Sequence, residues 1–257
     1  MTALLQALGI KQGIVAAIGA GGKKSLLYAI AAESTGRVAW TATVHTPRPP
    51  RWTGMEINVE SAEQLIRQAG LESGTRVRAF LQPAAKPGRV AGLGPEEVEA
   101  LHDAGDFDLT LVKADGARMR GIKAPKPGEP VLPKSTAKVL VVVSAAVLGQ
   151  PLDGRIAHRP ERIAEITGLE IGQRIGPEHF ARLFSAEHGL LQGTAPFSIC
   201  AVINQVDDEP RRSVAEAAAS AMLAANSALD RVVLTRLGPA CEAGRAVVGI
   251  LRRSDAC

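Results

Sequence analysis

Short apolar runs alternate with segments of helical period along most of the chain. Several of the runs are continuous stretches of Val, Ile, Leu and Ala, which is typical of strands covered by helices on both faces. The pattern therefore predicts an α/β fold with a doubly wound, mostly parallel sheet flanked by helices. The predicted strands are Gly13–Ile18, Arg37–Thr43, Arg76–Leu81, Asp108–Ala114, Lys138–Ser144, Phe197–Asn204, Arg231–Thr235 and Arg245–Leu251. The predicted helices are Lys24–Ser34, Ser61–Gly70, Pro95–Ala104, Arg159–Thr167, Pro177–His188 and Glu209–Leu229.

The 257 residues are enough for one large domain with a sizeable core, and no internal repeat divides them. We therefore expect a single α/β domain over residues 1–257. The strand signal is weakest at about residues 151–193, which we interpret as a candidate small helical insertion.

Polar residues gather where predicted strands end. The segment "GAGGKKS" follows the strand at 13–18, and "TATVHTPRPP" ends the strand at 37–43. Further along, "KADGARMRG" ends the strand at 108–114, and "NQVD" ends the strand at 197–204. In doubly wound sheets ligands bind beyond the carboxyl ends of the strands, so we expect the functional residues to lie in these clusters.

The segment "GAGGKKS", residues 19–25, is a glycine turn between a strand and a helix, where phosphates are often held. It fits neither GxGxxG, because Lys24 stands at the third glycine position, nor GxxxxGK[ST], because the loop is too short. The physical elements of a P-loop are still present: we expect glycine N–H groups to converge on an anion, and a lysine to neutralise a phosphate. We predict a P-loop-like site for ATP or GTP and Mg²⁺, with Ser25 as a metal ligand if it lies on the first helical turn. The alternative is a glycine-rich turn with solvated lysines.

The segment "NQVD" is similar to the NKxD element that holds a guanine base, with Gln205 in place of lysine. Asp207 would accept hydrogen bonds from the guanine edge, and Asn204 would tie loops together. Gln205 supplies neither an aliphatic stem nor an ammonium group over the base. Asn and Asp at strand ends are also common turn formers, so both interpretations stay open.

Charge narrows the class of ligand. Residues 113–138 contain seven basic residues against two acidic ones, which favours a phosphorylated or otherwise anionic ligand over a neutral one. A solvated basic loop would have the same composition. Aromatic residues are 3% of the chain and no nucleic-acid motif is recognisable, so we expect no nucleic-acid partner.

The remaining composition bears on location. No apolar stretch approaches the ~20 residues that cross a bilayer, and the N-terminal segment "MTALLQALGIKQG" has no signal-peptide pattern. Cys200, Cys241 and Cys257 are far apart and form no CxxC pair, which argues against a disulfide framework or zinc ribbon. We therefore expect a cytoplasmic protein with no membrane partner. Nothing in the sequence indicates its oligomeric state.

The segment "KADGARMRGIKAPKPGEPVLP", residues 113–133, resembles the YqeC family. The same order of blocks is found in "GAGGKKSLLYAIA", "TATVHTPRP", "LGQPLDGRIAHRPE" and "VINQVD", so the resemblance covers about residues 13–207. The family is described as P-loop-like accessory factors in selenium cofactor biosynthesis for selenium-dependent molybdenum hydroxylases. The resemblance implies a pathway more readily than a reaction.

The resemblance also implies which residues form the site. The family's glycine loop corresponds to Gly19, Gly21, Gly22 and Lys23; many members have threonine where this chain has Lys24, which leaves Ser25 as the candidate metal ligand. Its TTTH block corresponds to Thr41, Thr43 and His45, its DGAR block to Asp115, Gly116, Ala117 and Arg118, its KAP and EP blocks to Lys123, Pro125, Glu129 and Pro130, and its HRPE block to His158, Arg159, Pro160 and Glu161.

We infer roles for these residues from their chemistry. Asp115 ends a buried strand, where P-loop proteins place the carboxylate that holds Mg²⁺. Thr41 and Thr43 are candidates for positioning a water or the metal. Arg118, Lys123 and Arg159 are candidate ligands of a phosphate or oxyanion substrate. His45 and His158 are candidate acids or bases, or alternatively loop-tethering residues. A selenium-carrying cysteine is disfavoured, because Cys200 lies in an apolar strand and Cys257 at the chain end.

These features favour a nucleotide-dependent accessory protein of that pathway, one that hydrolyses ATP or GTP or transfers a group from it. Two alternatives stay open. The first is a scaffold or chaperone whose affinity for a target hydroxylase is switched by bound nucleotide, and the second is a kinase of a small metabolite.

Overall fold

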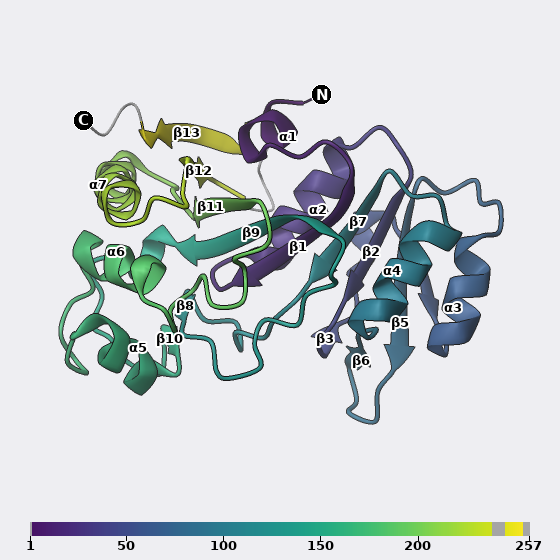
Figure 1. Cartoon of the computed structure of the whole chain (residues 1–257), viewed down its shortest axis with the longest axis horizontal. Coiled ribbons are helices and arrows are strands. Elements are labelled where there is room, and N and C mark those ends of the chain that lie inside the picture. The colour runs from purple at the N-terminus through teal and green to yellow at the C-terminus, as the bar shows by residue number, and fades with distance from the viewer. Residues whose placement is uncertain (1, 238–244, 254–257) are drawn as a thin grey trace.

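The centre of the molecule is one mixed, mostly parallel sheet, seen in a computed structural model that describes residues 2–237 and 245–253 (Figure 1). Its strand order is β13-β12-β11-β9-β1-β7-β2-β5-β6-β3, with β4 beside β5. The strands are β1 (Gly13–Gly19), β2 (Val38–Ala42), β3 (Thr46–Pro47), β4 (Glu56–Val59), β5 (Val77–Pro83), β6 (Arg89–Ala91), β7 (Leu109–Lys113), β9 (Thr136–Ser144), β11 (Ile199–Asn204), β12 (Arg231–Thr235) and β13 (Val247–Arg252). A separate two-stranded sheet pairs β8 (Ile122–Lys123) with β10 (Ala157–His158) in parallel.

Helices cover both faces of the sheet, as the continuous apolar strands predict. They are α1 (Ala3–Leu8), α2 (Lys23–Glu33), α3 (Ala62–Ala69), α4 (Pro95–Ala104), α5 (Pro160–Thr167), α6 (Pro177–Ser185) and α7 (Glu209–Ala225). Strand β1 shows the two-sided burial most directly. Ile14, Ala16 and Ile18 belong to the apolar cluster under α3, α4, α6 and α7, whereas Val15 and Ala17 belong to the cluster under α1 and α2. The sheet is therefore the middle layer of three.

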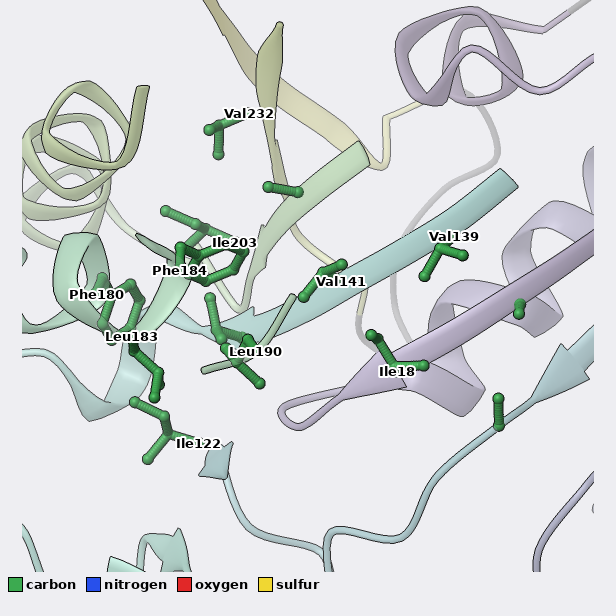
Figure 2. Packing of buried hydrophobic residues seen from close by; sticks show 14 of the residues in the cluster. Ile18, Ile122, Val139, Val141, Phe180, Leu183, Phe184, Leu190, Ile203 and Val232 are labelled. Atoms are coloured by element: carbon green, nitrogen blue, oxygen red, sulfur yellow. The ribbon is translucent and has the colours of Figure 1, made fainter. Parts of the chain in front are cut away.

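The larger of the two clusters is shown in Figure 2. Phe180, Leu183 and Phe184 of α6 lie against the sheet in the same cluster as Val141 of β9 and Ile203 of β11. All five side chains are at most 1% exposed. Helix α6 also packs along α7. The segment that contains α5 and α6, which lies between β9 and β11 in the sequence, therefore helps to cover this face of the sheet.

Local signals set several helix starts. Helix α3 begins after Ser61, whose hydroxyl accepts from the backbone N–H of Gln64 while the Gln64 side chain accepts from the N–H of Ser61. Helix α7 begins after Asp208, whose carboxylate accepts from the N–H of Arg211 at 2.8 Å. These caps place the helix starts within one or two residues of those predicted from the pattern.

The α/β class and the mostly parallel sheet are thus confirmed, and the differences lie at the edges. Strand β13 runs antiparallel to β12, and β6 runs antiparallel to β5. The sequence pattern did not predict the six-residue α1 or the short strands β3, β4, β6, β8 and β10. Such short segments contain too few repeats of the hydrophobic pattern to be recognised. Residues 151–193 contain β10, α5 and α6. Among the described residues, every helix is too short or too polar to span a bilayer.

Candidate nucleotide site

The glycine turn lies at the carboxyl end of β1, between the ends of β7 and β9. Gly19, Gly21 and Gly22 have φ angles of +90°, +80° and +123°, which favour glycine. A Cβ atom on Gly19 would lie 2.2 Å from the carbonyl oxygen of Val142, and one on Gly22 would lie 2.1 Å from the side-chain amide of Asn204. The turn is therefore shaped by close packing against the ends of β9 and β11.

Two of the glycine amides are already engaged inside the protein. The N–H of Gly19 donates to Oδ2 of Asp115 at 2.8 Å, and the N–H of Gly21 donates to the carbonyl of Arg120 at 3.0 Å. The expected convergence of all glycine amides on one anion is therefore not what the turn shows. The first amides of an α-helix have no partner within the helix, which leaves those from Gly22 to Ser25 as the donors for an anion.

Asp115 meets the start of α2 directly. Strand β7 pairs with β1, so the chain that follows β7 reaches the glycine turn. Nζ of Lys23 lies 2.8 Å from Oδ1 of Asp115 and also donates to the carbonyl of Gly19. Burial lowers the pKa of Lys23, and the charge of Asp115 opposes that shift. The contact at Oδ1 is an ion pair without hydrogen-bond alignment, so this buried carboxylate oxygen keeps acceptor capacity.

Lys123 extends this pair into a chain of alternating charges. Its ammonium group lies 3.0 Å from Oδ2 of Asp115, 2.7 Å from Glu129 and 2.9 Å from the carbonyl of Gly116, and its side chain is fully buried. Arg159 binds the other side of Glu129 through both terminal nitrogens, each at 3.0 Å. Burial alone raises the pKa of Glu129, but hydrogen bonds from Arg159 and Lys123 outweigh it and lower the pKa to about 2. These contacts form a charge network, Lys23–Asp115–Lys123–Glu129–Arg159. It connects the segment between β7 and β9, and the start of α5, to the glycine turn.

Further positive charge surrounds the network. Lys113 is buried at the end of β7 and donates to the backbone carbonyl of Asp115 at 2.8 Å. Burial, together with the nearby charge of Lys23, lowers the pKa of Lys113 to about 7. Lys24 is half-buried, and burial followed by the charge of Arg89 lowers its pKa. A concentration of cations around two carboxylates creates a positive field that suits an anionic ligand.

The three candidates at the end of β2 and just beyond it are divided between the core and the surface. Thr41 is fully buried and its hydroxyl donates to the carbonyl of Phe80 at 2.7 Å, so it serves the β2–β5 contact. The hydroxyl of Thr43 donates to the carbonyl of Val131 at 2.8 Å, which joins this strand end to the loop that carries Glu129. His45 is exposed in the connection to β3. Of these three, Thr43 alone contacts the loop of the network.

The "NQVD" segment braces the glycine turn. The amide of Asn204 donates to the carbonyl of Gly21 at 2.8 Å and its oxygen accepts from Thr235 at 3.0 Å. The hydroxyl of Ser144 donates to the side chain of Gln205, whose φ is +63°. Asp207 is exposed and pairs with Arg211 at 2.8 Å. Asn204 thus ties two loops together as expected, whereas Asp207 faces solvent in this structure.

The other candidates lie around the rim. Ser25 and Arg118 are exposed, and Arg118 has a φ of +46°. Burial, followed by the charges of Arg159 and Lys123, lowers the pKa of His158 to about 4, so its imidazole is neutral at pH 7. Cys200 is buried within β11; Cys241 and Cys257 lie outside the described residues.

The sequence analysis gave no role to Glu129, which it placed only in the family's EP block, or to Lys113, which it counted only among the basic residues of 113–138; Glu129 belongs to the network and Lys113 lies beside it. A lysine within the apolar run "LTLVKAD" was a usable signal, because a lysine at a buried strand position requires a partner or a ligand. No group of three or more His, Cys, Asp or Glu residues that could hold a metal occurs in the described part of the chain.

The chain is an α/β protein with a large, mostly parallel sheet flanked by helices, an arrangement consistent with a P-loop-like fold. The sequence profile of the YqeC protein family matches residues 15–161, more than half of the chain, and the chain therefore belongs to this family. The protein YqeC of Escherichia coli (strain K12) is 34% identical over 159 residues. That alignment covers 61% of this chain and 61% of the relative, so the match spans about three fifths of the relative's length.

Proposed function

We propose that this protein binds a nucleoside triphosphate, ATP or GTP, together with Mg²⁺ at the glycine turn. The observation that carries the proposal is the meeting of Lys23, the first residue of α2, with Asp115 at the end of the neighbouring strand, at 2.8 Å. A lysine at a helix start and a buried carboxylate opposite it are the two charged groups that P-loop sites use. Both residues come from parallel strand ends, where doubly wound folds bind ligands.

The residues present fit such a ligand. Lys23 would exchange its contact with Asp115 for a phosphate, and the amides of residues 22–25 would donate to the same anion. Asp115, with a buried oxygen free of hydrogen bonds, and the exposed hydroxyl of Ser25 would hold the metal. Mg²⁺ keeps several waters and needs few protein ligands, so one carboxylate and one hydroxyl are enough. When bound, it would neutralise the charge of the phosphate oxygens.

We further propose that the nucleotide is used in selenium cofactor biosynthesis for selenium-dependent molybdenum hydroxylases, by hydrolysis or by group transfer. Support comes from family membership and from the DGAR, KAP, EP and HRPE blocks. In the structure these blocks supply Asp115, Lys123, Glu129 and Arg159, which form the charge network. The residues that carry the resemblance are therefore those that contact one another beside the glycine turn.

Titration calorimetry of the purified chain with ATP and GTP, in Mg²⁺ and in EDTA, tests the binding step. We expect saturable binding that requires Mg²⁺ and at least a tenfold rise in Kd for Lys23→Met. Lys11→Met, which removes an exposed lysine outside the site, is the matched control and leaves Kd unchanged. Absence of Mg²⁺-dependent binding, or equal Kd values for the two variants, would refute the proposal.

A second candidate function, a nucleotide-switched scaffold, has one specific observation in its favour. The carbonyl of Arg120 accepts from the glycine-turn amide of Gly21, and the neighbouring Met119 is 95% exposed with a φ of +61°. An exposed apolar tip joined to the glycine turn would report the state of that turn to a partner. Release of phosphate by the pure chain separates the two functions: steady turnover supports the enzyme, and tight binding without turnover supports the scaffold.

A further inference from the structure

A pocket of about 280 Å³ lies at the amino-terminal ends of β2, β5 and β7, opposite the strand ends that carry the glycine turn. Arg37 precedes β2, Arg76 precedes β5, and Asp108 precedes β7, so each of these residues stands at the amino-terminal end of its strand. These strands are parallel and β2 and β7 pair over five residues, so their two ends are about 15 Å apart, with the glycine turn at the far end. The pocket is therefore distinct from the candidate nucleotide site.

Arginine dominates the lining of the pocket. Arg37, Arg76 and Arg78 face it, against one lining carboxylate, that of Asp108. Oδ2 of Asp108 accepts from the backbone N–H of Arg37 at 2.7 Å, so this carboxylate serves the main chain. Glu56 lies behind the lining and contacts Nε of Arg78 at 3.2 Å.

The three arginines differ in how many of their side-chain N–H donors already bond within the protein. Arg78 is held by Glu56 and by the last carbonyls of α3, including Gln68 at 2.9 Å. Arg76 donates from one terminal nitrogen to the carbonyls of Ala31 and Ser34 at the end of α2, which leaves its other donors available.

Arg37 has the most side-chain N–H donors left for a ligand. Its guanidinium lies 5.6 Å from the ring centre of Phe107, a contact that uses none of its N–H donors. In residues 2–237 and 245–253, no carboxylate contacts the side chain of Arg37 or Arg76 at ion-pair distance. Two guanidinium groups from separate strand starts thus line one pocket with donors to spare.

We propose that this pocket binds a small organic polyanion, a metabolite that carries phosphate or carboxylate groups, with Arg37 and Arg76 as its ligands. Guanidinium groups bind both kinds of anion through paired N–H donors. The volume is near the low end of small-molecule pockets, ~300–1,000 Å³, which favours a ligand smaller than a nucleoside triphosphate. The hydroxyl of Thr75, also in the lining, adds a donor or acceptor. This site is additional to the proposed nucleotide function and does not depend on it.

The test uses pyrophosphate and citrate as probes, titrated into the full chain by calorimetry at 150 mM salt. All titrations are done in a Lys23→Met background, so that the glycine turn does not contribute. We expect one site per chain with a Kd below 1 mM for at least one probe, and a rise of at least tenfold when Arg37→Gln is added. Arg67→Gln, which removes an exposed arginine of α3 paired with Glu63, is the control and changes Kd by less than twofold.

A second measurement keeps the test independent of folding in the variants. Phenylglyoxal modifies accessible arginines, and peptide mass mapping of the unmutated chain shows which of them a probe protects. We expect the probe to protect Arg37 and Arg76 but not Arg67. Absence of binding by both probes, equal Kd values for Arg37→Gln and Arg67→Gln, or equal modification of Arg37 with and without probe would each overturn the proposal.

Discussion

Replacing Lys123 by methionine tests how strongly the charge network holds the site together. The side chain is fully buried, and its ammonium group has three acceptors, Asp115, Glu129 and the carbonyl of Gly116, within 3.0 Å. Methionine keeps a similar length and removes the charge, which leaves two carboxylates with one cation fewer. Removing one partner of a buried ion pair typically costs about 3–5 kcal/mol.

The expected loss lies at the lower end of that range. Asp115 keeps Lys23 and the amide of Gly19, and Glu129 keeps both nitrogens of Arg159. We therefore expect Lys123→Met to lower the free energy of unfolding by about 3 kcal/mol, which corresponds to a fall in Tm of about 6 °C for a chain of this size.

Urea unfolding followed by circular dichroism measures this loss, because urea does not screen charge. Lys126→Met, which removes an exposed lysine of the same loop, is the matched control and is expected to change the free energy by at most about 0.5 kcal/mol. Adding Glu129→Gln to Lys123→Met removes one of the two carboxylates that have lost the ammonium group, so the two losses should not add. A loss below about 1 kcal/mol for Lys123→Met would refute the view that the network is a coupled unit.

Three further predictions concern single positions. Gly22→Ala forces a Cβ to 2.1 Å from Asn204 at a φ of +123°, so it should cost at least about 2 kcal/mol more in urea unfolding than Gly88→Ala, which has a positive φ but open space around it; equal costs would contradict the close packing. His158, with a pKa lowered to about 4 by burial and neighbouring cations, should remain neutral in an NMR titration until well below pH 6, and because the unfolded chain takes up this proton near 6.5, stability should fall as the pH drops from 6.5 towards 4. A titration midpoint at 6 or above would contradict it. Burial raises the pKa of Cys200 to about 12, so iodoacetamide at pH 8 should leave the Cys200 peptide of the folded protein unmodified in mass mapping, and rapid alkylation would show that β11 opens.

Much of the fold could be predicted because its strands are long and buried on both faces. The apolar runs at 13–18 and 138–144 have few alternatives to a central strand, and both became central strands, β1 and β9. The antiparallel direction of β13 could not be derived, because direction depends on how the chain returns to the edge of the sheet and not on its own pattern.

The candidate site was predictable where residues follow strand ends directly. Lys23 and Asp115 come together because β1 and β7 are parallel neighbours. The pairing of Glu129 with Arg159 was not predictable, since 30 positions that include strand β9 separate them and the contact depends on the path of the loops on either side of that strand. Similarly, the sequence shows that glycines are present at 19 and 21 but not that their amides are used by Asp115 and Arg120.

Helix α2 runs from the carboxyl ends of the parallel strands to their amino-terminal ends. Lys23 begins it beside the glycine turn, and Arg76 donates to the carbonyls of Ala31 and Ser34 at its other end. Its 11 residues form a rod of about 16 Å. The glycine turn and the arginine-lined pocket are therefore in contact with opposite ends of the same helix.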